Sequence, residues 1–231
     1  MVEPSELSLI IPLGPAETEA PRLIRTARRL PEAWERIVSA SRGHGVQVPA
    51  PWTTVEGDVG RGRQLNRGAA AASGRWLWFV HADSLPDQHA IDAVAEALAN
   101  DARILAYHPL RFDPDGPRLS ALNALGANLR SRLLGLPYGD QGVLIRRGDF
   151  QALGGFREDL ARGEDLDFLV RARHAGVRLH ALRGRMRSSA RRYRDRGWLR
   201  TTIEHQIAAF HLIRNARARA LVQPADGRSR R

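Results

Sequence analysis

Runs of hydrophobic residues alternate with amphipathic stretches along the first half of the chain. The pattern predicts strands at residues 7–12, where Pro12 stops the run, and at 35–40, 53–55, 75–80 and 103–107. Helical patterns fall between them at 17–30, 65–73 and 86–99, where Pro86 and Asp87 suit a first helical turn. Strands that alternate with helices at this spacing predict an α/β fold, with a mostly parallel sheet and helices on both faces.

The pattern loosens after the turn-rich segment 113–117. Here the sequence predicts a helix at 119–134, a short strand at 142–145 and a helix at 166–175. We expect one domain over residues 1–195, followed by a basic amphipathic C-terminal helix and tail at 196–231.

An apolar stripe marks this last helix. Its members recur at helical spacing: Trp198, Leu199, Ile203, Ile207, Phe210 and Ile213. One interpretation packs the stripe on the domain and leaves the arginines in solvent. The other places the basic helix in an anionic membrane interface, and the two are compatible if the helix packs while its arginines face the lipid.

The net charge of +11 gathers at the C-terminal end of the 231-residue chain. Residues 183–231 hold 14 arginines against three acids, whereas the first 182 residues are balanced at 22 basic and 22 acidic side chains. Because the excess sits in the tail and no reading motif is recognised, we predict no nucleic-acid partner.

Several classes of protein are excluded by the composition. The chain has no cysteine, so it forms neither disulfides nor thiolate zinc sites. The apolar run at 7–13 is too short for a signal peptide, and no stretch approaches the roughly 18 to 20 apolar residues of a membrane-spanning helix. We therefore expect a cytoplasmic protein, either soluble or peripheral on the inner face of the membrane.

Polar residues follow the predicted strand at 75–80 directly, as His81-Ala82-Asp83. Ligands of open α/β sheets bind beyond the carboxyl ends of the strands. Asp83 there could hold Mg²⁺ or Mn²⁺, ions that take their other ligands from water and substrate phosphates. Alternatively, Asp83 caps the turn before the next helix. His81 either contacts the metal or the acceptor, or is simply hydrogen-bonded.

Two further segments carry candidate chemistry. Residues 60–68 place glycines with Arg61 and Arg63 at the mouth of an Ala-rich helix, which suits a diphosphate, although a solvated turn has the same pattern. Residues 163–168 start a helix with Glu164, Asp165 and Asp167. Acids at this position either stabilise the helix start or serve as a general base.

The combined pattern resembles the family 2 glycosyltransferases of the GT-A kind. It consists of 60–83, Tyr138-Gly139-Asp140-Gln141-Gly142 with Arg146 and Arg147, Gly154-Gly155-Phe156 and Glu164-Asp165. The chain looks most similar to a small bacterial subgroup found beside radical-SAM genes, which also has His-Ala-Asp in place of Asp-x-Asp. Order and spacing match over residues 7–198.

This resemblance implies a metal-dependent transfer of a sugar, with inversion, from a nucleotide-sugar donor to an acceptor hydroxyl that could be lipid-linked. Asp83 would hold Mg²⁺ or Mn²⁺ and Asp165 would be the catalytic base, with Glu164 as the next candidate. The implied donor-site residues are Arg61, Arg63, Asn66 and Asp83. The implied acceptor-site residues are Tyr138, Asp140 and Gln141.

The sequence departs from the family pattern after the second strand. Family members have an acid there that holds the nucleobase or ribose, whereas this chain continues Ser39-Ala40-Ser41-Arg42-Gly43. Either Glu17 or Glu19 compensates, or the nucleotide is held differently. A third possibility is a catalytically silent paralogue that binds a nucleotide or a sugar.

Overall fold

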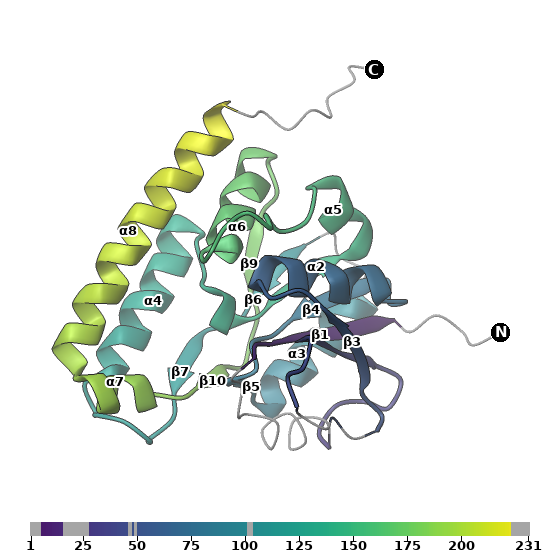
Figure 1. Cartoon of the computed structure of the whole chain (residues 1–231), viewed down its shortest axis with the longest axis horizontal. Helices are drawn as coiled ribbons and strands as arrows, with labels where there is room; N and C mark the ends of the chain where they lie inside the picture. Colours follow the sequence, from purple (N-terminus) through teal and green to yellow (C-terminus); the bar gives the residue numbers. More distant parts are fainter. Residues whose placement is uncertain (1–5, 16–27, 46–47, 49, 101–103, 223–231) are drawn as a thin grey trace.

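The computed structural model describes residues 6–15, 28–45, 48, 50–100 and 104–222 (Figure 1). Its main sheet has seven strands in the order β3-β2-β1-β4-β8-β6-β9. Their bounds are β1 Leu7–Leu13, β2 Glu35–Ser41, β3 Thr53–Gly57, β4 Trp76–Phe79, β6 Leu105–Tyr107, β8 Val143–Arg146 and β9 Leu179–Ala181. This is the GT-A-like α/β architecture that the sequence predicts.

Side chains of the central strands alternate between two cores, one on each face of the sheet. Trp76 and Trp78 of β4 pack into one core, while Leu77 and Phe79 pack into the other. The period of two follows from strand geometry, and burial on both faces explains why the run is apolar throughout.

Helices cover both faces of the sheet, as expected. Helix α3 (Gln88–Ala99) packs into the core that holds Trp78, and α2 (Arg61–Ala71), α5 (Arg147–Ala152) and α6 (Glu164–His174) pack on the other side. The remaining helices are α4 (Ser120–Leu134), α7 (Arg191–Arg196), α8 (Trp198–Val222) and the 3-10 turn η1 (Gly139–Gln141). Figure 1 shows α4 and α8 side by side at one end of the sheet.

A second, small sheet was not expected from the sequence. It joins β5 (Ser84–Pro86), β10 (Met186–Ser188) and β7 (Leu110–Phe112), in that order from edge to edge. Each strand has three residues, too few for a hydrophobic period to appear. The sheet ties the segment after Asp83 to the chain that leads into α7.

Strand directions bring one set of strand ends together. β1, β2, β3 and β4 are parallel, so their carboxyl ends share one edge of the sheet. β8 runs antiparallel to β4, with Phe79 opposite Val143. Therefore η1, which precedes β8, lies beside the residues that follow β4.

Two helix starts differ from the predictions. Helix α2 begins at Arg61, so Gly62 and Arg63 lie inside the helix rather than in a loop before it. Pro86 ends strand β5, and Asp87 is the N-cap of α3, its carboxylate accepting from the Ala90 amide at 2.8 Å. Asp83 is therefore not the N-cap of α3, whereas its interpretation as a residue that caps or polarises the preceding turn stays a prediction.

Most of the predicted helix at 17–30 lies outside the described residues, and residues 28–30 form a turn. The predicted strand at 103–107 is observed as β6 from Leu105, and Arg103 also lies outside the described residues.

The inward side chains of α8 are small or polar, apart from Leu212 and Ile213, which pack partly buried against the core. Arg219 pairs with the buried Asp167 of α6 at 2.9 Å, and Leu212 abuts Gly163 at the start of α6. The apolar side chains Leu199, Ile203, Ile207 and Phe210 point into solvent, each 49% to 64% exposed. The expectation that the stripe packs on the domain is wrong for these four residues.

None of the helices in the described part of the chain is long and apolar enough to cross a bilayer.

Candidate active site

The candidate site lies where β4 ends and η1 begins. After Phe79, the chain leaves β4 through Val80 and turns at His81, whose carbonyl accepts from the Ser84 amide at 3.0 Å. The turn places His81 and Asp83 at the carboxyl edge of the sheet. Both residues are half-buried.

Gly139 lies between His81 and Asp165. A β-carbon at Gly139 would come within 2.3 Å of His81 Nε2 and 2.8 Å of Asp165 Oδ2. The Gly139 amide donates to Asp165 Oδ2 at 2.5 Å, and the Leu166 amide donates to Oδ1 at 2.8 Å. Only a residue without a side chain fits here, and the two amides fix the orientation of the Asp165 carboxylate.

His81 is held in its neutral form. Desolvation of its ring lowers its pKa well below the usual value, and the positive charge of Arg61 lowers it further. A neutral imidazole retains one nitrogen that can accept a hydrogen bond or ligate a metal.

The Asp140 carboxylate lies near those of Asp83 and Asp165. Burial, with the charges of Asp83 and Asp165, raises the pKa of Asp140 to about 7. Within the described residues, Asp140 Oδ1 is shielded from solvent and has no hydrogen-bond partner. A shielded carboxylate oxygen that lacks a donor fits a position that a cation completes.

Glu164 faces Arg61 across the start of α6. Its side chain is 2% exposed, and its Oε1 lies 3.8 Å from Arg61 Nε. Burial and the Asp165 charge raise the pKa of Glu164, Arg61 opposes both, and the value is about 7. Arg61 thus contributes positive charge to a group of four acids: Asp83, Asp140, Glu164 and Asp165.

Helix α4 contributes a residue that the sequence did not single out. The Arg130 guanidinium lies over the Tyr138 ring, with Cζ 3.3 Å from the ring centroid, and Nε donates to the Leu136 carbonyl at 2.9 Å. Burial lowers the pKa of Arg130, while Tyr138, Asp140 and Asp165 raise it. A helical arginine 35 residues before Asp165 gives no local signal of this contact.

Gln141 forms the framework beneath the site. Its side chain is fully buried, and Oε1 accepts from Ser131 Oγ at 2.7 Å and from the Tyr138 amide at 3.0 Å. Its Nε2 donates to the His108 carbonyl at 3.1 Å. These bonds hold η1 against α4, so any effect of Gln141 on an acceptor acts through the position of Tyr138.

Asn66 has a similar fastening role. Its amide group exchanges two hydrogen bonds with the backbone of Phe156, at 2.8 and 2.9 Å, and it also donates to Glu158. Arg63 Nε lies 4.0 Å from the same Glu158 carboxylate. The structure therefore groups Arg63 with Asn66 and Glu158, and groups Arg61 with the acids.

Polar side chains of α2 occupy the carboxyl ends of β1 and β2. Gln64 Nε2 donates to the carbonyls of Leu13 and Ser39, and Arg67 Nη2 donates to the Ala40 carbonyl at 2.9 Å. In this region the family pattern has an acid that this chain lacks. Glu17 and Glu19, which the sequence offers as substitutes, lie outside the described residues.

The residues present fit a metal that takes few ligands from the protein. Among the described residues, no three His, Asp or Glu side chains form a complete metal site. Mg²⁺ and Mn²⁺ at phosphate-transfer sites commonly use one or two carboxylates, with substrate oxygens and water completing the shell. Asp83 with the partner-free oxygen of Asp140 matches that donor set.

Residues 53–153 match the family described as Glycosyl transferase family 2. The matched segment holds Arg61, Asp83, Arg130 and η1, which are the parts that meet at the sheet edge. The match covers less than half of the chain, and Glu164 and Asp165 lie beyond it. A comparison with curated protein sequences finds no match.

Solved structures show the same fold at low sequence identity. The crystal structure of S. aureus TarS 1-349 has a TM-score of 0.62 and 14% identity, covering 80% of this chain and 60% of that one. Its complex with UDP-GlcNAc has a TM-score of 0.60 and 15% identity, covering 80% of this chain and 58% of that one. The mannosyltransferase PcManGT from Pyrobaculum calidifontis, in complex with GDP-Man and Mn²⁺, has a TM-score of 0.55 and 18% identity, covering 77% of this chain and 56% of that one. This chain thus spans less than two thirds of the length of each.

Proposed function

We propose that the protein transfers a sugar from a nucleoside-diphosphate sugar to an acceptor hydroxyl, with inversion at the anomeric carbon. The observation that carries the proposal is the meeting of Asp83, Asp140 and Asp165 with His81 and Arg61 at one sheet edge. All of these except Asp165 lie in the segment that matches the family 2 model. The similar structures with bound UDP-GlcNAc and GDP-Man support this class of donor.

Asp165 is the proposed general base. The acceptor oxygen attacks the anomeric carbon, its proton passes to the Asp165 carboxylate, and the bond from the anomeric carbon to the diphosphate oxygen breaks. The amides of Gly139 and Leu166 hold that carboxylate in place. Asp165 extends from the first turn of α6, so its position is set by backbone rather than by a flexible loop.

Arg61 and Asp83 are proposed to hold the donor diphosphate, Arg61 directly and Asp83 through Mg²⁺ or Mn²⁺ with Asp140 as second ligand. When bound, the metal neutralises charge on the leaving diphosphate as a Lewis acid. Arg63 and Asn66 shape the donor side by fastening the loop at Phe156. Tyr138, with Asp140 and Gln141 behind it, borders the acceptor.

Nucleotide binding can be tested first. The nucleotides UDP, GDP, UDP-GlcNAc and GDP-mannose, each with and without Mn²⁺, should include one that raises thermal stability in a Mn²⁺-dependent way. At 100 times its dissociation constant, a ligand that binds only the native state adds about 2.7 kcal/mol. Asp83→Asn should abolish the Mn²⁺-dependent part, whereas Asp92→Asn, on the exposed face of α3, should keep it. Loss in both variants, or in neither, contradicts the metal assignment.

The base can be tested separately by turnover. Asp165→Asn should leave the nucleotide-induced stabilisation unchanged and lower release of nucleoside diphosphate with acceptor by about 10² to 10⁴. Unaltered turnover would move the role to Glu164, whose own Gln variant then becomes the decisive measurement.

A nucleotide- or sugar-binding protein without turnover is the second candidate. It is favoured by Arg67 and Gln64, which occupy the strand ends where family members have an acid for the nucleoside. Two results together would establish this alternative. A nucleotide sugar would stabilise the protein in a Mn²⁺-dependent way without yielding product from any acceptor, and Asp165→Asn would not change the release of nucleoside diphosphate.

A further inference from the structure

The large hydrophobic side chains that face solvent are concentrated on two helices. Among the described residues, eleven are conspicuously exposed, and only Val59 lies away from α4 and α8. On and beside α4 they are Leu119, Leu122, Leu125, Leu129, Leu133 and Leu134. On α8 they are Leu199, Ile203, Ile207 and Phe210. We call these ten residues the α4–α8 apolar face.

The two helices are joined near their first turns. Asn123 of α4 donates to Thr202 Oγ1 at 2.9 Å and accepts from Trp198 Nε1 at 2.6 Å. Since the helices lie side by side with their starting turns in contact, they run in the same direction (Figure 1).

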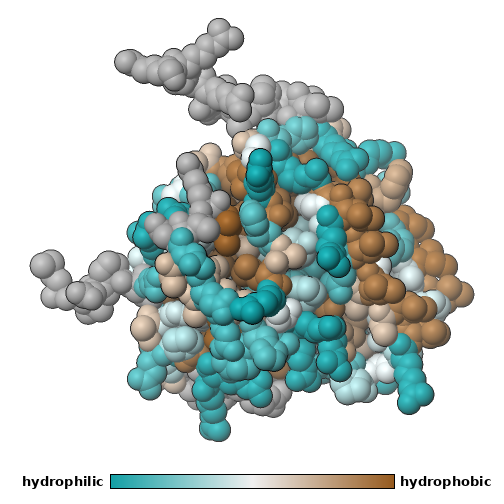
Figure 2. All heavy atoms as spheres, turned by 180° about the vertical axis from the view of Figure 1, so that it is seen from behind, coloured by the Kyte–Doolittle hydropathy of each residue, from teal (hydrophilic) through white to brown (hydrophobic). Residues whose placement is uncertain are grey.

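Both stripes turn to the same side of this seam. Leu122 precedes Asn123 by one residue, and Ile203 follows Thr202 by one residue. Successive residues lie about 100° apart around a helix. In two parallel helices, one step back from the contact on α4 and one step forward from it on α8 lead to the same side, so the stripes meet on one surface. Figure 2 shows hydrophobic side chains gathered along the side of the molecule where α4 and α8 lie.

The charges around this face are almost all positive. Helix α4 has no acid, and its Arg130 lies on the inner side of the helix over Tyr138. On α8, Arg219 pairs inward with Asp167, and the one acid, Glu204, pairs with Arg200 at 2.8 Å. Arg214 and Arg217 follow Phe210 by four and seven residues and therefore extend its side of the helix.

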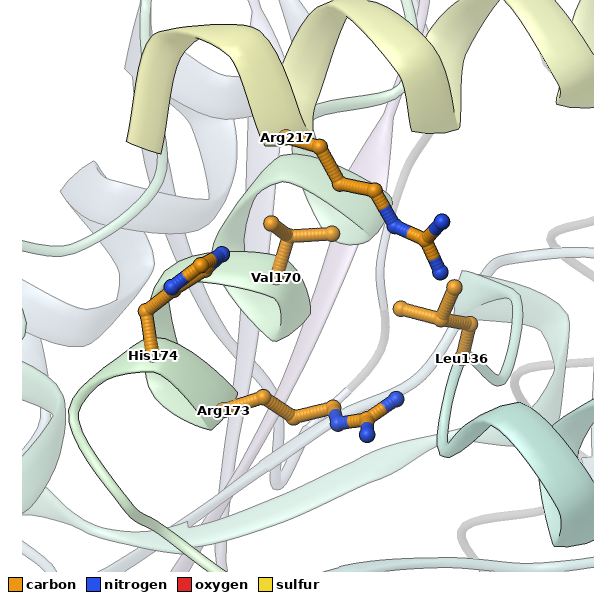
Figure 3. A pocket seen from close by; sticks show the side chains of 5 residues that line it. All are labelled: Leu136, Val170, Arg173, His174 and Arg217. Carbon is orange, nitrogen blue, oxygen red and sulfur yellow. The ribbon is translucent and has the colours of Figure 1, made fainter. Parts of the chain in front are cut away.

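A basic pocket lies beside the end of the face. It has a volume of about 330 Å³ and is lined by Leu136, Val170, Arg173, His174 and Arg217. Figure 3 shows the guanidinium groups of Arg173 and Arg217 on the same side of the pocket, near Leu136. The apolar face thus continues into a group of exposed cations.

We propose that the α4–α8 apolar face docks on an anionic lipid surface, with Arg214, Arg217 and Arg173 contacting phosphate groups at its edge. Exposed leucines flanked by arginines suit an interface that is apolar below and anionic above. A second copy of this chain suits the face less well, because it would place arginines against arginines. The inference does not depend on sugar transfer.

The absence of cysteine allows this proposal to be tested residue by residue. Single variants Leu125→Cys, Phe210→Cys and Val59→Cys can each be labelled at one site with an environment-sensitive fluorophore. Vesicles of phosphatidylcholine with phosphatidylglycerol should blue-shift the labels at 125 and 210 and leave the label at 59 unchanged. The same vesicles at high salt, or phosphatidylcholine alone, should give much smaller shifts.

Vesicle sedimentation of unlabelled protein gives the matched quantitative test. Arg214→Gln with Arg217→Gln should weaken partitioning to anionic vesicles by about 30-fold, at about fivefold per arginine. Arg28→Gln with Arg29→Gln removes the same charge from exposed positions outside the face and should have little effect. Leu125→Gln with Phe210→Gln should weaken partitioning by at least about tenfold, and Val59→Gln should not.

Three results would overturn the proposal. One is the absence of any shift at 125 and 210 on anionic vesicles. Another is equal loss of partitioning in both arginine pairs, which would show attraction by net charge alone. The third is a dimer in lipid-free solution that Leu125→Gln with Phe210→Gln dissociates, since a second copy would then cover the face. Thermal unfolding checks that each variant is folded, and the single-cysteine labels decide the case if a double variant is not.

Discussion

Helices α3 and α4 are similar in length, but α3 buries its large apolar side chains and α4 exposes them. Helix α3 buries Ile91, Val94 and Leu98 against the sheet and exposes its polar side chains. Helix α4 buries small residues, bonds inward through Asn128 and Ser131, and turns its leucines outward. The difference teaches that α3 is shaped by the core alone, whereas α4 lies between a polar site and an exposed apolar surface.

The comparison predicts unequal costs for the same substitution. Leu98→Ala in α3 should lower the free energy of unfolding by about 2 to 5 kcal/mol, because it leaves a cavity in the core. Leu125→Ala in α4 should change it by less than about 0.5 kcal/mol, because the side chain is in water. Urea denaturation of both variants measures the difference. Equal losses would mean that Leu125 is buried in the protein as it exists in solution.

Polar residues should show the reverse order. Asn128→Ala removes the bonds that its amide makes to both the Leu110 amide and the Leu110 carbonyl, at 2.7 and 2.9 Å. It should cost about 2 to 3 kcal/mol, since two backbone groups lose their partner. Gln88→Ala on the exposed side of α3 should stay within about 0.5 kcal/mol. A small effect of Asn128→Ala in the same denaturation experiment would show that α4 is not held by its inward bonds.

The smallest expected effect concerns pH. His108 is fully buried next to Gln141, and burial lowers its pKa from 6.5 to about 4. The unfolded chain therefore binds a proton between pH 6.5 and 4 that the folded chain does not, so stability falls as pH falls through this window. From pH 7 to pH 5 the contribution is about 2 kcal/mol.

The control for this effect is His108→Gln, because other acids and histidines also titrate. The difference in unfolding free energy between pH 7 and pH 5 should be smaller in the variant than in the original chain. An unchanged difference would assign the pH dependence to other groups.

The sequence predicted the parts of the fold whose signals are local. The apolar runs at β1 and β4 and the long patterns of α3 and α4 place those elements to within a few residues. The three-residue strands of the second sheet were missed, because such segments are too short to show a period. The start of α2 was placed too late, because Gly60 and Gly62 are typical of loops, yet Gly62 packs against the Arg157 carbonyl inside the helix start.

The candidate site was predicted in part. Asp83, Glu164 and Asp165 follow from strand ends and helix starts, and their donor and catalytic roles stay predictions. Arg130 contacts Tyr138 through a packing of α4 that no pattern in the sequence specifies. Likewise, the inward bonds of Asn66 and Gln141 depend on partners about 90 and 33 residues away, which sequence spacing does not reveal.

The sequence did not predict that the leucines of α4 face outward. A helical stripe at 119–134 reads the same whether it faces a core or a solvent, because periodicity gives a face without its direction. The direction is set by Asn128 and Ser131, whose hydrogen bonds fix the opposite side toward η1.

The position of Arg130 has a consequence for reach. Arg130 lies over Tyr138 on the inner side of the same helix that carries Leu129 and Leu133 on its outer side. A helix with its side chains is about 10 to 12 Å across. With the face docked as proposed, an acceptor anchored in the bilayer would therefore have to extend its hydroxyl past only one helix, a span on the order of ten covalent bonds.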